Sequence, residues 1–200
     1  MKVSIIYLAS GNSRRFGSNK LLYPFLGKPM YQHLLDKLVR ICSRHSDWQI
    51  IVVSQHKEIL RELEKWPLKT IYCPDSVKGI SWTIKAGVSA ADSSDACAFY
   101  VADQPYFTEK TAEEFLSYME RKESNLGCVS FQEDLGNPVW FSRKYFKELK
   151  ELKGDQGGKK ILMKYKHKVE TYPVLNALEL KDFDYLEEVH GTLEIIDENR

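Results

Sequence analysis

Cysteine is scarce in this chain, and the four that are present lie far apart in the sequence. No C-x-x-C pair occurs, so the spacing of a zinc ribbon or of a thioredoxin-type redox motif is absent. Cys97 and Cys128 fall in apolar runs, which predicts buried thiols that pack as small hydrophobic side chains. Cysteines without an evident pairing pattern fit a reducing, cytoplasmic setting.

Long hydrophobic runs and a strong net charge are also missing. No apolar stretch approaches the roughly 20 residues that span a bilayer, and the apolar segment at the N-terminus is too short for a signal peptide. The formal net charge is only +1, which provides no large positive field for nucleic acid or for an anionic membrane. We therefore expect neither nucleic acid nor membrane as a partner, and any anion site must be local.

Histidine is present five times, but in no pattern that indicates chemistry. The five residues show neither metal-ligand spacing nor an arrangement of base and nucleophile: His33, His45, His56, His167 and His190. Serine-hydrolase chemistry therefore has little support, since its hydroxyl nucleophile needs an adjacent base.

What the sequence does contain is a regular alternation of strand-like and helical segments. The composition, with 43% apolar and 28% charged residues, is ordinary for a globular protein, and the length of 200 residues predicts one domain, residues 1–200. The expected strands are Val3–Ala9, Gln49–Ser54, Lys69–Cys73, Ala96–Ala102, Gly127–Phe131, Pro138–Phe141 and Lys168–Tyr172. Such alternation predicts a Rossmann-like, open three-layer α/β/α sheet that is mostly parallel.

Helices are expected between several of these strands. Apolar residues recur at helical spacing over Met30–Cys42. Thr108 and Ser142 are plausible N-caps of two further helices, and Lys159–Tyr165 is a short third one. The last ten residues read as a surface tail.

The loop after the first strand is the most informative stretch, because it combines glycines with clustered cations. Gly11 and Gly17 allow its backbone N–H groups to turn toward one point. Arg14, Arg15 and Lys20 add positive charge, and amide donors with fixed cations suit a polyphosphate. The spacing is neither Walker A nor the dinucleotide fingerprint. A plain strand-to-helix turn with solvated basic residues is the alternative.

A carboxylate, Asp103, follows directly after the apolar run Ala96–Ala102. In open α/β sheets ligands bind beyond the carboxyl ends of the strands. That rule places Asp103 and the 8–20 loop at one crevice, where a carboxylate can hold Mg²⁺ together with nucleotide phosphates. The alternative is that Asp103 caps the turn before Thr108.

Residues 79–87 form a third element. Gly79 can bring backbone close to a ligand, and the Ser81 hydroxyl can bond a base edge or a sugar. Trp82 could stack on a ring, but such a residue is more often part of the core. A capped helix start is the simpler interpretation of this stretch.

Later segments contain weaker signals. Residues 136–138 (Gly-Asn-Pro) and 154–157 (Gly-Asp-Gln-Gly) look like tight turns at element ends. Asp182 and Asp184 lie two residues apart, so an extended segment places them on one face, where one could reach a metal opposite Asp103. A solvated acidic turn is the alternative.

Together these motifs resemble the nucleotidyltransferase family that attaches a nucleotide to molybdopterin. That family opens with approximately L-A-[AG]-G-x-S-x-R-M-G-x-x-K, followed by L-x-x-x-x-G-x-P. Here residues 8–20 read L-A-S-G-N-S-R-R-F-G-S-N-K, and Leu22, Gly27 and Pro29 follow at the family's spacing. The resemblance continues through residues 103–105, 136–139 and 154–157 and spans about residues 3 to 190.

Three departures from the family pattern stand out. Ser10 replaces an alanine or glycine near the expected base, and Phe16 replaces methionine. The family's late D-I-D-T-P-E-D segment survives only as D-F-D-Y-L-E-E from Asp182, which puts Asp184 as a metal ligand in doubt. Within the family, the cytidylyl branch looks closer than the guanylyl branch, because residues 79–87 are similar to its serine-containing base segment.

The resemblance implies a fold of the nucleotide-diphospho-sugar transferase type and an EC 2.7.7-type reaction with Mg²⁺ as cofactor. CMP would pass from CTP to the phosphate of molybdopterin or molybdenum cofactor, and pyrophosphate would be released. A molybdenum hydroxylase is the kind of recipient that this product implies.

The resemblance also implies roles for individual residues. Arg15 would hold the β- and γ-phosphates, Lys20 the α-phosphate, and Asp103 the Mg²⁺, with Asp184 as second metal ligand. The remaining binding residues are Leu8, Ala9, Gly11, Asn12 and Ser13 in the opening loop, Gly79 and Ser81 at cytosine and ribose, and Asn137 and Asp155 toward the pterin phosphate.

Other functions stay open at this point. The same chemistry could use GTP or ATP, or another phosphorylated acceptor. A non-catalytic carrier of finished cofactor would bind the pterin without releasing pyrophosphate, although it would need neither Lys20 nor Asp103. A regulator that only binds nucleotide fits the spread of motifs least well.

Overall fold

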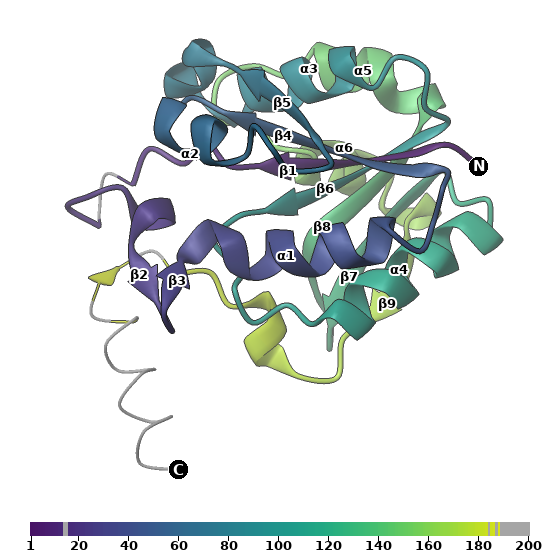
Figure 1. Ribbon diagram of the computed structural model, residues 1–200. Helices are drawn as coiled ribbons and strands as arrows, with labels where there is room; N and C mark the ends of the chain where they lie inside the picture. Colours follow the sequence, from purple (N-terminus) through teal and green to yellow (C-terminus); the bar gives the residue numbers. More distant parts are fainter. Residues whose placement is uncertain (14–15, 184, 187, 189–200) are drawn as a thin grey trace.

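A seven-stranded sheet forms the centre of the molecule (Figure 1), in the order β5-β4-β1-β6-β8-β7-β9. The computed structural model describes residues 1–13, 16–183, 185–186 and 188. The strands of this sheet are β1 Val3–Leu8, β4 Trp48–Ser54, β5 Lys69–Tyr72, β6 Ala96–Val101, β7 Leu126–Phe131, β8 Asp134–Ser142 and β9 Glu170–Pro173. A separate two-stranded hairpin consists of β2 Pro24–Phe25 and β3 Lys28–Pro29.

Most neighbours in the large sheet run parallel. β1 pairs in parallel with both β4 and β6, β5 pairs in parallel with β4, and β9 pairs in parallel with β7. β8 is antiparallel to both β6 and β7, because only a short turn separates β7 from β8 and a tight turn can join only antiparallel strands. The predicted mostly parallel α/β sheet is confirmed.

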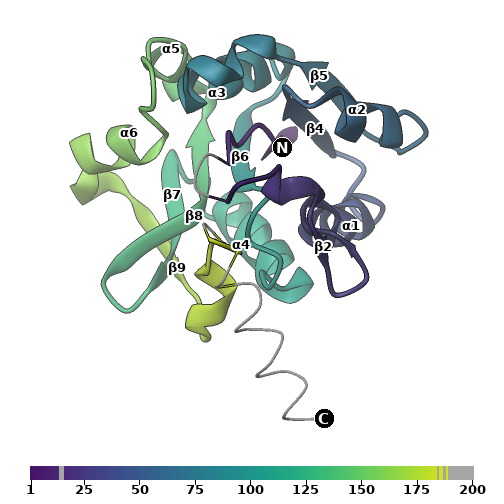
Figure 2. The same ribbon diagram turned by 90° about the vertical axis from the view of Figure 1, so that its left-hand side faces the viewer.

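Helices cover both faces of the sheet (Figures 1 and 2). They are α1 Met30–Cys42, α2 Lys57–Glu62, α3 Ile80–Ala90, α4 Glu109–Arg121, α5 Phe146–Lys150 and α6 Lys159–Lys164. Short 3₁₀ turns occupy η1 Lys20–Leu22, η2 Pro74–Lys78, η3 Arg143–Tyr145, η4 Lys166–Lys168 and η5 Ala177–Leu180.

The core divides into two layers because successive side chains of each strand point to opposite faces. Ile5 and Tyr7 of β1 pack in the cluster that contains the apolar face of α1 and α4. Ile6 packs in the other cluster, with residues of α3, α5 and α6. Strands that are buried on both faces are apolar almost throughout, which is why the sequence predicts β1 and β6.

The predicted caps have different outcomes. Thr108 caps α4, since its side chain accepts a hydrogen bond from the Thr111 N–H at 3.1 Å. Ser142 stands at the predicted N-cap position, because the 3₁₀ turn η3 begins at Arg143 and continues into α5 at Phe146. Its side chain does not cap this segment, since the hydroxyl donates to the Asn125 side chain at 3.1 Å. Ser142 is also the last residue of β8, and its hydroxyl lies beside the loop that leads into β7.

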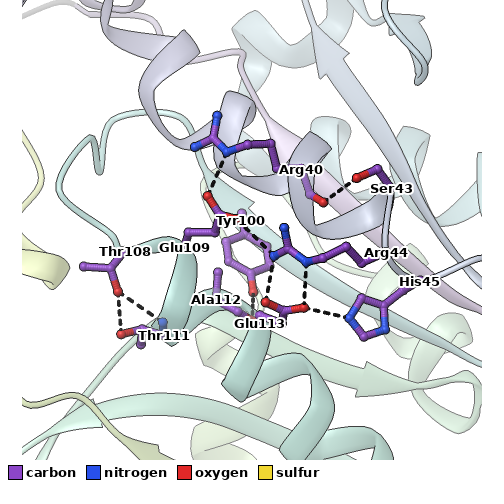
Figure 3. Close-up of polar contacts among 10 residues, drawn as sticks. All are labelled: Arg40, Ser43, Arg44, His45, Tyr100, Thr108, Glu109, Thr111, Ala112 and Glu113. Atoms are coloured by element: carbon purple, nitrogen blue, oxygen red, sulfur yellow. Dashed lines mark hydrogen bonds and ion pairs between the residues drawn. The ribbon is translucent and has the colours of Figure 1, made fainter.

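Helices α1 and α4 are joined by a row of ion pairs on the surface (Figure 3). Arg40 contacts Glu109 at 2.8 Å, while Arg44 contacts Glu113 at 2.7 Å. His45 bonds the same Glu113 carboxylate at 2.9 Å. Hydrogen bonds from Arg40 and Arg44 lower the pKa of the two glutamates. Such exposed pairs contribute little free energy individually, but they connect α1 to the helix that follows the Asp103 loop.

The structure shows how deeply two cysteine thiols are buried and how long the helices are. Cys97 and Cys128 are fully buried, as predicted, and burial raises the pKa of the Cys128 thiol to about 11. No described helix is long and apolar enough to cross a membrane.

Candidate active site

A cavity of about 220 Å³ opens at the carboxyl ends of β1 and β6. Five of the predicted binding residues line it: Leu8, Gly11, Asn12, Gly79 and Asp155. Lys20 and Asp103 line it as well. The loops that follow these strands meet because β1 and β6 are parallel neighbours in register, with Leu8 opposite Val101.

The central contact of the cavity is an ion pair between residues far apart in the sequence. The Lys20 ammonium lies 2.6 Å from Oδ2 of Asp103. The Lys20 side chain is 8% exposed and that of Asp103 20%, so both charges are largely withdrawn from bulk water. A fixed cation beside a carboxylate in a partly buried cavity can act on a phosphate more strongly than the same charges in water.

The residues that follow β4 form hydrogen bonds to the opening loop. The Gln55 side chain donates to the Ser10 carbonyl at 2.8 Å and to the Asn12 side chain at 2.8 Å. The His56 ring contacts the Gly11 carbonyl at 3.2 Å. Gln55 and His56 were not predicted, although their position directly after a buried strand was the available signal.

The end of the opening loop is shaped by local backbone bonds. Ser13 has a φ of 47° and Gly17 a φ of 78°, so the chain turns twice through the left-handed region. The Ser13 hydroxyl accepts from the Lys20 N–H at 3.1 Å, which ties the start of η1 to the loop. Arg15, predicted to hold phosphates, lies outside the described residues, as does Arg14.

A second wall of the cavity is formed where two loops touch through their backbones. Gly79 has a φ of 131°, and a Cβ there would lie 2.3 Å from the carbonyl carbon of Gly154. The Ser81 N–H donates to the Gly154 carbonyl at 3.1 Å. Asp155 lines the same cavity as Gly79, although the family resemblance implied that Asp155 faces the pterin phosphate and Gly79 the base.

Several predicted residues lie away from the cavity wall. Ala9 is fully buried, and its N–H donates to the Val53 carbonyl at 2.9 Å. The Ser81 side chain is also fully buried, and its hydroxyl has no hydrogen-bond partner within the described residues. Ser13 lies in the loop behind Lys20, and Asn137 lies in β8 before a cis peptide bond to Pro138.

The late acidic pair can be placed only in part. Asp182 accepts a hydrogen bond from the Gln104 side chain at 2.8 Å, next to Asp103 in the chain. Asp184, the predicted second metal ligand, lies outside the described residues.

The donor set at Asp103 is compatible with a magnesium ion. Within the described residues, no group of three or more His, Cys, Asp or Glu side chains could hold a metal. Mg²⁺ does not require such a group, because it usually keeps waters and phosphate oxygens beside one or two carboxylates. Only Oδ2 of Asp103 contacts Lys20, which leaves Oδ1 for another ligand in the described part of the site.

A buried phenol lies beneath the site. The Tyr7 hydroxyl donates to the Tyr31 carbonyl at 2.7 Å, and burial raises the pKa of Tyr7 well above its usual value, assisted by the Asp103 charge. Tyr7 is therefore a neutral structural donor and not an acid or base of the site.

A family model described as the MobA-like NTP transferase domain matches residues 5–169 of the chain. The chain belongs to this family. The resemblance drawn from the sequence is thereby confirmed at the level of the family.

Relatives of this MobA-like domain have several names. The chain is 28% identical over 168 residues to the purine catabolism protein PucB of Bacillus subtilis, with 78% of each protein covered. It is 33% identical over 128 residues to a probable molybdenum cofactor guanylyltransferase of Thermococcus sibiricus, which covers 62% of this chain and 59% of that one. Among solved structures, Rv0371c of Mycobacterium tuberculosis aligns with a TM-score of 0.82 at 20% identity, over 97% of this chain and 98% of that chain. The last similarity concerns the fold.

Proposed function

We propose that this MobA-like domain transfers CMP from CTP to the phosphate of molybdopterin or molybdenum cofactor and releases pyrophosphate. The observation that carries the proposal is the ion pair of Lys20 and Asp103, 2.6 Å apart in one cavity with the opening loop. A cation and a metal-binding carboxylate at one point are what a nucleoside triphosphate needs at its α-phosphate.

In the reaction, an oxygen of the acceptor phosphate forms a bond to the α-phosphorus, and the bond from that phosphorus to the β-phosphate bridging oxygen breaks. The electron pair leaves with pyrophosphate. Lys20 would neutralise charge on the α-phosphate as the new bond forms, and the backbone N–H groups of Gly11 and Asn12 would donate to the phosphates. No side chain has to remove a proton, because the attacking phosphate oxygen is already ionised at neutral pH.

Asp103 would hold Mg²⁺, and a second carboxylate would come from Asp184 or Asp182. When bound there, Mg²⁺ would supply positive charge to the phosphate oxygens. Arg15 would bind the β- and γ-phosphates.

GTP is the second candidate nucleotide. The Thermococcus sibiricus relative is named as a guanylyltransferase, which favours guanylyl transfer. The similarity of residues 79–87 to the cytidylyl branch supports CTP instead. The PucB relative is named for purine catabolism. Our proposal also includes a molybdenum hydroxylase as the enzyme that receives the product.

Release of pyrophosphate from each of the four nucleoside triphosphates, with and without molybdopterin and with and without Mg²⁺, tests the proposal. We expect release only with CTP, acceptor and Mg²⁺ together, and mass spectrometry should find the cytosine dinucleotide of the pterin. If only GTP among the four nucleotides supports release, the substrate of the proposed reaction is GTP and not CTP. Tight binding of the pterin without release under any condition would identify a carrier and overturn the enzymatic proposal.

A further inference from the structure

The loop that carries Asp103 consists of turns, from β6 to the start of α4 at Glu109. Its position therefore depends on the groups that hold it. We infer that Lys37 and Glu179 are positioning residues, which fix the backbone of this loop so that Asp103 faces Lys20. The inference rests on the proposed function, because that function gives Asp103 its role.

Lys37 of α1 binds the loop from one side. Its ammonium donates to the carbonyl of Pro105 at 2.9 Å and to that of Phe107 at 2.8 Å. No carboxylate of the described residues lies within ion-pair distance of Lys37, so these carbonyls are its main partners. Partial burial disfavours the charged ammonium and lowers the pKa of Lys37. A charge kept in such a place costs free energy unless it makes strong hydrogen bonds, so it is best explained by its hold on the loop.

Glu179 of η5 binds the same loop from another part of the chain. It is only 6% exposed, and its carboxylate accepts a hydrogen bond from the Thr108 N–H at 2.9 Å. The Gln104 side chain adds a bond to the Leu180 carbonyl at 3.2 Å. This segment lies beyond residues 5–169, the part that the family model matches.

Both contacts reach the loop through its backbone and leave the Asp103 side chain to Lys20. A misplacement of about 1 Å at a catalytic group can cost on the order of 100-fold in rate. Loss of either contact should therefore slow the reaction more than it weakens nucleotide binding.

The test compares Lys37→Met with Arg40→Met. Arg40 lies on the same helix and joins α1 to α4 through Glu109, but no contact joins its side chain to the loop carbonyls in the described structure. For Lys37→Met we expect kcat of pyrophosphate release to fall on the order of 10- to 100-fold with little change in KM. The apparent dissociation constant for Mn²⁺ with CTP present, followed by electron paramagnetic resonance, should rise as well. Arg40→Met should match the wild type in both measurements.

Glu179 provides an independent pair of variants. Glu179→Gln keeps an oxygen that accepts from Thr108 and should retain most activity, whereas Glu179→Ala should behave like Lys37→Met. This pair decides the question if Lys37→Met does not fold. Wild-type kcat and Mn²⁺ affinity in Lys37→Met, or equal losses in Arg40→Met, would overturn the inference. If the wild type releases no pyrophosphate, the proposed function fails, and the Mn²⁺ titration of the same variants still reports on the loop.

Discussion

At the scale of single residues, charge placement matters more than charge number. The formal net charge of the chain is only +1. Lys20 nevertheless lies in an ion pair with Asp103, and only 8% of its side chain is exposed. Removal of one charged donor from a preorganised site typically costs about 100- to 1,000-fold in kcat. The consequences can be tested one side chain at a time.

Replacement of Lys20 should affect the chemical step. Lys20→Ala is expected to lower kcat of pyrophosphate release by about 100- to 1,000-fold with little change in KM, because the charge acts where negative charge builds up. Steady-state kinetics on the wild type and the variant measure this. Lys144→Ala, at an exposed lysine outside the cavity, is the matched control. A rise in KM at constant kcat would make Lys20 a ground-state ligand only.

His33 should make stability depend on pH. Burial lowers the pKa of His33 below its usual value, and its ring bonds the Phe25 carbonyl at 2.6 Å. Between the lowered folded pKa and the unfolded value of about 6.5, the unfolded chain binds more protons, so stability rises with pH and is lost as the pH falls through this window. Urea unfolding at pH 7.5 and at pH 5 should show a larger loss for the wild type than for His33→Gln. Equal losses in the two proteins would contradict this role of His33.

At the scale of elements, the cavity depends on loops that touch without side chains between them. The Gly79 and Gly154 backbones meet where η2 passes into α3. A larger residue at position 79 would collide with this backbone, which cannot move aside as a flexible side chain could.

Gly79→Ala and Gly17→Ala separate close approach from backbone conformation. Both glycines have positive φ, at 131° and 78°, but a Cβ at Gly17 meets nothing within 4 Å while one at Gly79 overlaps Gly154. We expect Gly17→Ala to cost about 1 kcal/mol, and Gly79→Ala to cost a further 1–3 kcal/mol for overpacking. Denaturant unfolding of both variants measures the difference, and equal costs would mean that the two loops separate easily.

At the scale of the whole molecule, a segment near the end of the described chain packs against the N-terminal part. Phe183 is fully buried in a cluster with Phe16 of the opening loop, Phe25 of β2 and Met30 of α1. Its ring lies 5.4 Å from that of Phe25 and 5.9 Å from that of Tyr106, which belongs to the Asp103 loop. The segment after β9 thus packs on the opening loop and on the Asp103 loop.

Removal of this ring should weaken the entire fold. Phe183→Ala is expected to cost about 3–5 kcal/mol, as for other buried aromatic side chains. Leu175→Ala provides the control, because Leu175 lies in the same segment but is 94% exposed. Thermal or urea unfolding of the two variants makes the comparison. A loss in Phe183→Ala no larger than that in Leu175→Ala would show that this segment does not stabilise the domain.

The sequence by itself determined the features that depend on local pattern. α1 was predicted over Met30–Cys42 and is found there, because its apolar residues recur at helical spacing. Strands β1, β4 and β6 were predicted within a residue at each end, because buried parallel strands are continuous apolar runs. The opening motif gave the family for the same reason: its residues are contiguous.

Only the tertiary structure decided which distant residues meet. The contact of Lys20 with Asp103 follows from the adjacency of β1 and β6, and the hold of Glu179 on Thr108 follows from the return of the chain after β9. The position of Asp155 beside Gly79 is of the same kind. These facts have no local signal, since they arise from packing between segments that are far apart in the sequence and whose own propensities are compatible with other arrangements.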